Sequence, residues 1–383
     1  MPPLWLSEGQ EGPNHMARED RAARKVSAYR RTRVPAQSPR MTKDDYKGLS
    51  IAWPKGLAPV PQPIDPAPSP NARLPRVDAI AMMDTEAEAE AMCDVLTPGH
   101  YYTDWYTYAR NYSAYVDQLG PRSAAIDAKY LGKYFVVTIG RLRVLVYKTN
   151  LHMHDDAKLM PNGSYSLPIK QMLQQMIEEA RPRLFLTTGT SGGVYPHMQL
   201  GDVVVTRAAR FYCKEDFKNA PFNNKTFRSD WDIPKEYAAT AHKLMQKYAK
   251  NLHGKAEPPS AHCSSNNSGK YPTDIYFDGT DKIPPFHPIL TTDFFEFGTT
   301  TNKLYRLGVA VEMDDACLGL VCSEMKNPPL WASVRNLSDP CINGDLPYKE
   351  QSNCAEFYYS KYGYWTTVMS GITTWAILAG FRK

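Results

Sequence analysis

The chain has 383 residues, of which 43% are hydrophobic and 22% charged, so it can bury a large core and is not predicted to be disordered throughout. Its net charge is only +5, and its Lys and Arg residues show neither aromatic interleaving nor a basic helix in the folded part, which argues against a nucleic-acid partner. The N-terminus lacks an apolar core of signal-peptide length, and the stretch 368–381 is too short and too polar to span a bilayer. We therefore expect no membrane association and a packed C-terminal helix.

The cysteine and histidine patterns predict neither disulfide nor metal chemistry. Seven cysteines stand at irregular spacings and form no CxxC pair, so we expect no disulfide framework and no structural zinc site. A reducing cytosol is the simplest compartment for such a chain. His152 and His154 suit one face of a strand, but no third ligand is evident. We predict no metal and no cofactor.

Residues 1–75 differ from the rest of the chain. They contain thirteen of the 31 prolines, and a basic run lies within 21–33. Proline at this density blocks helices and sheet ladders. We predict a disordered basic arm and an extended, proline-rich linker over 1–75, followed by one catalytic domain over 76–383.

The domain begins with alternating strand and helix patterns. Its first half predicts a buried strand at 77–82, a helix at 85–96 capped by Thr85, a tyrosine-rich insertion at about 100–130, two alternating strands within 133–148, and an amphipathic helix at 166–180 with Ser166 as its cap and Pro168 in its first turn.

The second half repeats the alternation. It predicts a buried strand running into a glycine turn over 183–193, a strand within 201–210, a long insertion at about 212–285 with a helix at 236–248, and strands followed by polar turns within 307–325 and 328–340. This order predicts an α/β fold, a three-layer α/β/α sandwich around a mostly parallel or mixed sheet.

Polar groups follow several of these strands, where open α/β sheets bind ligands. In the segment 188–193, Gly189 allows backbone N–H groups to approach an anion or a hydroxylated ligand, and Thr190 adds a donor, although a tight structural turn explains the glycines as well. In 311–316, Asp314 could accept hydrogen bonds from two ribose hydroxyls while Met313 packs on the sugar, or the acidic residues could complement a helix N-terminus.

Two further segments offer carboxylates for proton transfer. Asp339, preceded by Ser338, leaves a buried strand and suits either a helix cap or a general acid with a raised pKa. Glu86 follows the first strand, where it could favour the helix dipole or hold a nucleophilic water.

In combination the motifs are more specific than any one of them. Their order is M-x-x-E at 83–86, TG-[ST]-x-GG at 188–193 with GD-[IV]-V-V after it, D-x-F at 293–295, V-x-M-[ED] at 311–314 and V-R-x-x-SD at 334–339. This order resembles the nucleoside phosphorylase superfamily, most closely its 5′-methylthioadenosine/S-adenosylhomocysteine nucleosidase branch, over roughly residues 77–340.

The resemblance implies a role for each matching residue. Glu86 would orient the attacking water, with Arg335 and Thr190 helping to hold it. Asp339 would protonate the purine at N7, with Ser338 fixing its orientation. Phe295 would stack on the base, and Met313 and Asp314 would contact the ribose. Such a reaction needs a protonated leaving base and negative charge near an oxocarbenium-like sugar.

One position departs from the family pattern. The family has glutamate where this chain has Asp314, and one methylene less draws the carboxylate back by on the order of 1 Å. We expect Asp314 to reach the ribose nevertheless. The neighbouring Asp315, turned about 100° around the helix, is expected to face away from the sugar, so that its loss would be nearly silent.

The phosphorylase branch needs arginines that hold phosphate, and the positions where its hexameric members carry them are occupied here by MMDTE and Thr187. The sequence therefore predicts a purine, most simply adenine, nucleoside or nucleotide N-ribosyl hydrolase, cytoplasmic and homodimeric or larger, with a small-molecule substrate as its partner. A phosphate-dependent phosphorylase and a non-catalytic nucleoside-binding or sensor protein remain the alternatives. Arg207 and Arg210 could favour a 5′-phosphate, although surface arginines are more often solvated.

Overall fold

The computed structural model describes residues 48–252, 263, 273–280 and 283–382, and the basic run of the predicted arm lies outside them. The described strands are β1 (Val60–Pro61), β2 (Ala79–Met83), β3 (Tyr106–Tyr108), β4 (Gly132–Ile139), β5 (Leu142–Thr149), β6 (Leu184–Gly193), β7 (Val203–Thr206), β8 (Ala208–Phe211), β9 (Thr226–Arg228), β10 (Ile275–Phe277), β11 (Ile289–Thr291), β12 (Ala310–Glu312) and β13 (Leu330–Asp339). The helices are α2 (Glu86–Leu96), α3 (Tyr112–Val116), α4 (Ala124–Ala128), α5 (Pro168–Ala180), α6 (Ala238–Tyr248), α7 (Asp315–Glu324) and α8 (Tyr348–Gly380).

One mixed sheet joins these strands. Its main path runs β1-β4-β5-β2-β6-β12-β11-β8-β9. Off this path, β13 pairs with both β6 and β7, and β10 pairs with β7. The pairs of β2 with β5 and β6, and of β6 with β13, are parallel, whereas β4 and β5 form an antiparallel meander. The parallel strands β2, β6 and β13 therefore end at the same edge of the sheet.

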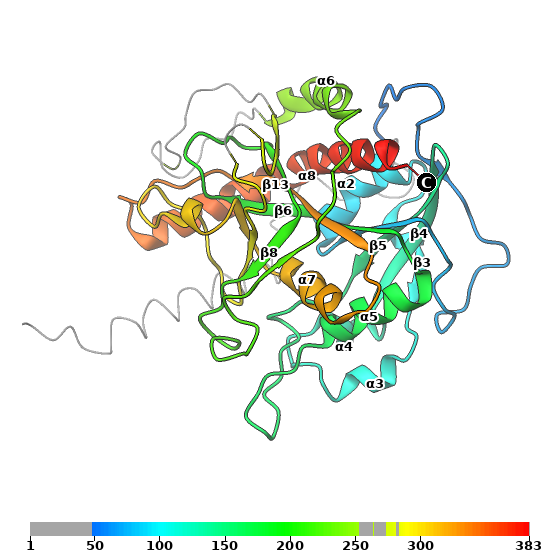
Figure 1. The fold of residues 1–383 in the computed structure, drawn as a ribbon, viewed down its shortest axis with the longest axis horizontal. Helices are drawn as coiled ribbons and strands as arrows, with labels where there is room; N and C mark the ends of the chain where they lie inside the picture. The colour runs from blue at the N-terminus through cyan, green and yellow to red at the C-terminus, as the bar shows by residue number, and fades with distance from the viewer. Residues whose placement is uncertain (1–47, 253–262, 264–272, 281–282, 383) are drawn as a thin grey trace, which may run out of the picture.

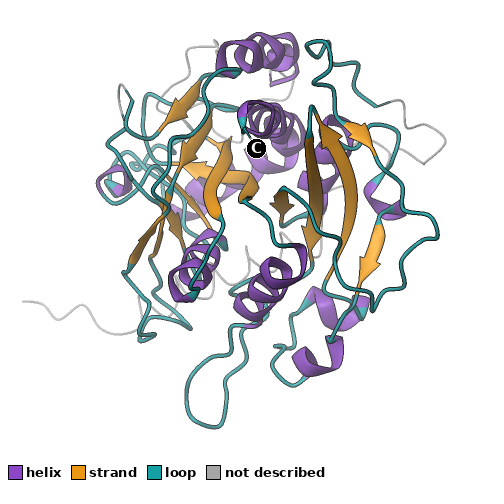
Figure 2. Ribbon diagram, turned by 45° about the vertical axis from the view of Figure 1, so that its right-hand side comes forward, coloured by secondary structure: helices purple, strands orange, loops and turns teal. Residues whose placement is uncertain are grey.

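Helices cover both faces of this sheet (Figure 2). Successive residues of a strand point to opposite faces, and in β2 the side chains of Ala79, Ala81 and Met83 join one core, which also contains α2 and α8, while Ile80 and Met82 join a second core with α5 and α7. In Figure 1, α8 lies beside α2 on one side of the sheet, and α5 and α7 lie on the other. The predicted three-layer α/β/α sandwich is confirmed.

Helix starts agree with the sequence in two cases and differ in a third. Thr85 caps α2 through a capping box, because its hydroxyl accepts a hydrogen bond from the Glu88 N–H and the Glu88 carboxylate accepts one from the Thr85 N–H. Pro168 opens α5 as predicted. Ser166 is not its cap, because its hydroxyl donates to the Gln118 carbonyl instead.

The glycine segment after the buried strand is itself strand. β6 continues through Gly193, because β13 pairs with it along its length and β12 pairs with its last two residues. The predicted turn is therefore wrong, and the backbone of 188–193 is held rigidly within the sheet.

The proline-rich segment from residue 48 onward packs on the domain, which corrects the predicted boundary at residue 76. The Trp53 ring lies 4.4 Å from that of Trp375, and the Trp375 indole N–H donates to the Leu57 carbonyl at 2.7 Å. Further along, β1 pairs with the edge of β4, and Leu74 is buried. The backbone is extended, as expected of prolines, but the apolar side chains between them bury surface that the sequence argument assigned to solvent.

The two predicted insertions contribute to the sheet and its surroundings. From the first, β3 pairs with β4 and the Tyr108 and Tyr115 side chains are buried. From the second, β9 pairs with β8 and β10 with β7. Residues 253–262, 264–272 and 281–282 of the second insertion lie outside the described residues.

Two cysteines form a bond that their spacing does not predict. Cys263 and Cys354 form a disulfide across 91 residues of sequence, and the other five cysteines are buried thiols. The fold brings Cys263 onto α8, which no sequence spacing reveals. Because disulfides persist mainly in oxidising compartments, the cysteine pattern no longer favours a reducing cytosol.

The C-terminal helix is confirmed and is longer than expected. The 33-residue α8 packs against α2, α6 and the sheet, and most of its second half is buried. Within the described ranges, no helix combines the length and apolar character needed to cross a membrane.

Candidate active site

A buried arginine near the end of β13 gathers several carboxylates. The Arg335 guanidinium is 2% exposed, forks onto both oxygens of Asp315, and donates to Asp84 at 2.9 Å. Its nitrogens also lie 3.6 Å from a Glu312 oxygen and 3.9 Å from a Glu88 oxygen. Burial disfavours the guanidinium charge, but these carboxylates outweigh it and raise the pKa of Arg335 well above its usual value. The arginine therefore stays charged and fixes the cluster.

Glu88 links this cluster to the glycine-rich end of β6. One of its oxygens accepts hydrogen bonds from the Thr190 N–H and hydroxyl, both at 2.7 Å, and the other accepts the N–H groups of Asp84 and Thr85 at 2.9 Å. A Cβ on Gly189 would lie 2.4 Å from the same carboxylate, and the φ of this glycine is +151°. Glycine is thus required here by the close approach of Glu88.

The structure places Glu88, and not Glu86, beside Thr190 and Arg335. Glu86 is exposed in the first turn of α2. Two residues correspond to about 200° around a helix, so these two side chains point to nearly opposite sides. The capping-box pattern Thr85-x-x-Glu88 is the signal that sequence reasoning missed, because it predicts a Glu88 side chain folded back toward the end of β2.

Asp84 contributes a carboxyl group with an unsatisfied oxygen. One oxygen accepts from Arg335, whereas the other is buried and has no hydrogen-bond partner among the described residues. Burial raises the pKa of Asp84 to about 7; Arg335 opposes this rise, and Asp314 and Glu88 add to it. Near neutral pH this group can therefore exist with or without its proton.

The end of β12 and the residues that follow it place three acidic side chains in the site. Glu312 accepts the N–H groups of Asp314 and Asp315 at 2.6 and 2.9 Å, and burial raises its pKa well above the usual value. Asp314 accepts the Met153 N–H at 2.6 Å and lies 3.0 Å from His152 Nδ1. The carboxylate expected at the ribose is therefore already engaged by the loop after β5.

Asp315 does not point away from the site, as the sequence analysis predicts, but takes part in it. It is 1% exposed and forms the bidentate pair with Arg335. Removing one partner of a buried ion pair is strongly destabilising, so its loss would not be silent. Met313 lies between these elements and is half-buried.

Asp339 lies where β13 meets the end of β6. It pairs with Gly192 after a register shift at the preceding residues, and a Cβ on Gly192 would lie 3.1 Å from its carboxylate. The Ser338 hydroxyl lies 3.0 Å from an Asp339 oxygen and 3.3 Å from the Ser191 carbonyl. Both residues are buried, so the serine can hold the carboxyl group in one orientation.

The aromatic segment after β11 borders the same glycines. Phe295 is buried with its ring 5.6 Å from that of Phe297, and Gly298 packs so tightly that a Cβ there would meet the Gly193 carbonyl at 2.2 Å. Asp293 has a different task, since it accepts N–H groups from residues 214, 215 and 217 and so fixes the start of the second insertion.

A buried lysine joins the site without any signal in the sequence. Lys148 at the end of β5 donates to Asn150 at 2.6 Å and interacts electrostatically with Glu86, Asp84 and Glu88. Burial lowers its pKa despite these carboxylates. Nothing in the β5 pattern marks this lysine as buried.

Arg207 and the two histidines have partners of their own, whereas the buried Nε of Arg210 has no hydrogen-bond partner among the described residues. Arg207 pairs with Asp278 at 3.2 Å and lies over the Phe286 ring, so it is not free for a phosphate. His154 lies 3.5 Å from Asp216, whereas His152 contacts Asp314, so the two histidines do not converge on one point. In the part of the chain that the structure describes, no three His, Cys, Asp or Glu side chains could hold a metal together.

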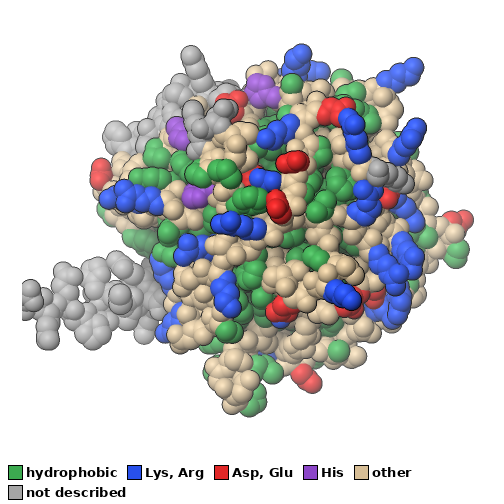
Figure 3. Space-filling view, viewed as in Figure 1, with side chains coloured by type: hydrophobic (Ala, Val, Ile, Leu, Met, Phe, Trp, Pro, Cys, Tyr) green, Lys and Arg blue, Asp and Glu red, His purple; other side chains and the backbone are tan. Residues whose placement is uncertain are grey.

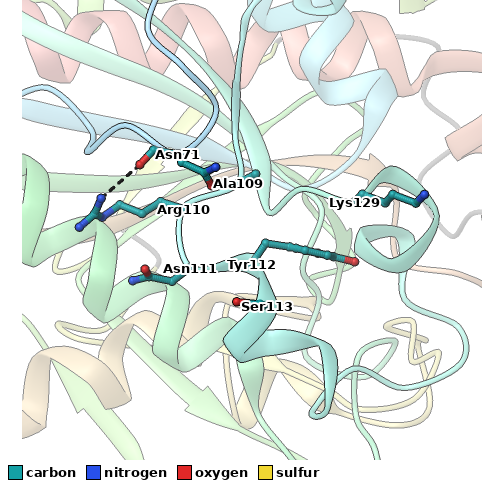
Figure 4. A pocket seen from close by; sticks show the side chains of 7 residues that line it. All are labelled: Asn71, Ala109, Arg110, Asn111, Tyr112, Ser113 and Lys129. Carbon is teal, nitrogen blue, oxygen red and sulfur yellow. Dashed lines mark hydrogen bonds between the residues drawn. The ribbon is translucent and has the colours of Figure 1, made fainter.

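A surface hollow lies outside this cluster (Figure 4). It is lined by Asn71, Ala109, Arg110, Asn111, Tyr112, Ser113 and Lys129. In this hollow, Arg110 donates to the Asn71 carbonyl and pairs with Glu179 at 2.8 Å, so its charge is already balanced by a carboxylate. On the face drawn in Figure 3, basic side chains are spread among acidic and hydrophobic ones.

Comparison with known proteins gives a family match and distant structural likenesses. A family model described as "Phosphorylase superfamily" matches residues 130–357. No curated protein sequence matches the chain. Among solved structures, the 5′-methylthioadenosine/S-adenosylhomocysteine nucleosidase of Neisseria meningitidis is 12% identical, with a TM-score of 0.43, covering 79% of this chain and 100% of that one. The futalosine hydrolase of Helicobacter pylori is 10% identical, with a TM-score of 0.41, covering 79% and 97%.

Proposed function

The chain belongs to the phosphorylase superfamily, and from this premise we propose that it is an N-ribosyl hydrolase, which cleaves the bond between a purine, most simply adenine, and ribose with water. The observation that carries the proposal is the Glu88 carboxylate, held at 2.7 Å by both donors of Thr190 at the edge of the sheet where β2, β6 and β13 end.

We assign the reaction to two carboxyl groups. Glu88, oriented by Thr190 and beside Arg335, is the group that would position the attacking water, the role that the resemblance gave to Glu86. Asp339, oriented by Ser338, would protonate the leaving purine. Phe295 would stack on the base, and Met313 would pack on the sugar. Fixed negative charge near the anomeric carbon would stabilise the oxocarbenium-like transition state.

The charge of the cluster favours water over phosphate as the nucleophile. The described site gathers Asp84, Glu88, Glu312 and Asp315 around one arginine, and Asp314 lies beside them on His152. A phosphate dianion entering this cluster would meet like charges. Lys148 is the observation in favour of phosphorolysis, because it is a cation beside the same carboxylates.

Product analysis distinguishes these reactions. Adenosine, its mono- and triphosphate and methylthioadenosine are incubated with the protein, with and without phosphate, and adenine, ribose and ribose 1-phosphate are quantified. We expect adenine release at the same rate in both buffers, with a free sugar as the co-product. Strict dependence on phosphate, with a sugar 1-phosphate as product, would establish phosphorolysis, and binding without release of adenine would establish a non-catalytic binding protein.

A further inference from the structure

The loop after β5 contributes a histidine that no motif identifies. His152 Nδ1 lies 3.0 Å from one oxygen of Asp314, while the next residue, Met153, donates its N–H to the other oxygen at 2.6 Å. Each oxygen of the carboxylate that the family motif assigns to the sugar therefore already contacts a group of this loop.

The histidine is the more accessible member of this pair. The side chain of Asp314 is 4% exposed, whereas that of His152 is 22% exposed. Because Nδ1 is engaged by Asp314, Nε2 is the remaining polar atom of the ring. An imidazole held at one nitrogen by a carboxylate presents the other nitrogen in a fixed direction.

The carboxylates that face the ring favour its protonated form. Asp314, Asp84 and Asp156 all act on His152, and although burial by itself lowers the pKa of the imidazole, their combined effect raises it. Asp84 also has its buried oxygen without a partner. A hydroxylated ligand beside the ring would bond to both groups, since a hydroxyl both donates and accepts.

We propose that His152, oriented by Asp314, is the side chain that hydrogen-bonds a ribose hydroxyl of the substrate. This inference rests on the proposed function, in which a ribonucleoside occupies the site. It assigns Asp314 a positioning role in place of direct sugar contact, and it explains how a chain with aspartate at this position can still recognise ribose.

The test compares adenosine with 2′,3′-dideoxyadenosine in the full-length protein. His152→Asn keeps a donor near the Nδ1 position for Asp314 but removes the nitrogen that would reach the sugar, and His152→Ala removes both. His154→Ala is the matched control, because this second histidine of the loop pairs with Asp216 outside the cluster. For each variant, the ratio of kcat/KM for the two nucleosides is measured, and thermal unfolding verifies folding.

We expect both His152 variants to lose about 10-fold or more of the preference for adenosine, which is the scale of one hydrogen bond to a charged group, and His154→Ala to keep it. An unchanged preference in His152→Asn would overturn the proposal, as would an equal loss on both nucleosides. If the wild-type protein binds adenosine without releasing adenine, the proposed function fails. The histidine's role is then decided by the ratio of the two dissociation constants, measured by calorimetry in the same variants.

Discussion

Replacing Glu88 by glutamine tests the centre of the proposed mechanism. The carboxylate accepts four hydrogen bonds, two at each oxygen. Glutamine has one oxygen and one NH₂ group, so in either orientation one pair of donors faces another donor. Two lost hydrogen bonds to a charged group, at about 1.5 kcal/mol each, give a loss of about 3 kcal/mol in the free energy of unfolding. For a chain of this size, this corresponds to a fall in Tm of about 4 °C.

The effect on activity should be larger than the effect on stability. Without a carboxylate to orient and activate water, adenine release should slow by about 100-fold or more. The assay is initial-rate adenine release at a temperature where urea unfolding shows the variant to be folded. Glu86→Gln is the matched control two residues earlier: its side chain is exposed, so it should lose at most about 1 kcal/mol from the helix dipole and keep its activity within about twofold.

The two variants separate the motif-based assignment from the structural one. A severe loss of activity in Glu86→Gln with near wild-type turnover in Glu88→Gln would refute the placement of Glu88 and restore the role that the resemblance implies. Equal, small effects in both would remove the water-orienting carboxylate from the mechanism altogether.

Three further predictions address the acid, the pH dependence and the N-terminal segment. Asp339→Asn keeps its size but cannot donate a proton, so kcat should fall by about 100-fold with little change in nucleoside binding by calorimetry; near wild-type turnover would contradict the role. Asp202, just before β7, is fully buried and accepts the N–H groups of Gln199 and Asp274. Burial raises its pKa from 3.8 to about 7, so its stabilising effect is complete below about pH 4 and is lost as pH rises through 7, by up to about 4 kcal/mol. Urea unfolding at pH 5 and pH 8 should show this decline, and Asp202→Asn should reduce it; an identical pH dependence in the variant would exclude this cause. A chain that begins at Gly48 should unfold like the full chain, whereas one that begins at Leu74 loses the packing of Trp53 on Trp375 and should lose about 3 kcal/mol or more; equal stability of the two truncated chains would show that the segment contributes nothing.

Local patterns in the sequence were sufficient for the elements and the family. The spacing of apolar residues predicted the β4–β5 meander and the apolar face of α5, and Thr85 predicted the capped start of α2, because each of these depends on residues close together in the chain. The ordered motifs at the strand ends indicated the superfamily that the family model confirms over residues 130–357.

The partners of the site residues depended on the tertiary structure. Arg335 and Asp84 are 251 residues apart, and His152 and Asp314 are 162 apart, so no local pattern could pair them. The motif spacing pointed to Glu86, but the rotation of α2 and the approach of Gly189 decided that Glu88 is the buried carboxylate. In the same way, the packing of Trp53 on α8 and the bond between Cys263 and Cys354 arise from surfaces that meet only in the folded chain. Periodicity specifies which face of an element is buried, whereas the side chains it meets there are decided by how the layers pack.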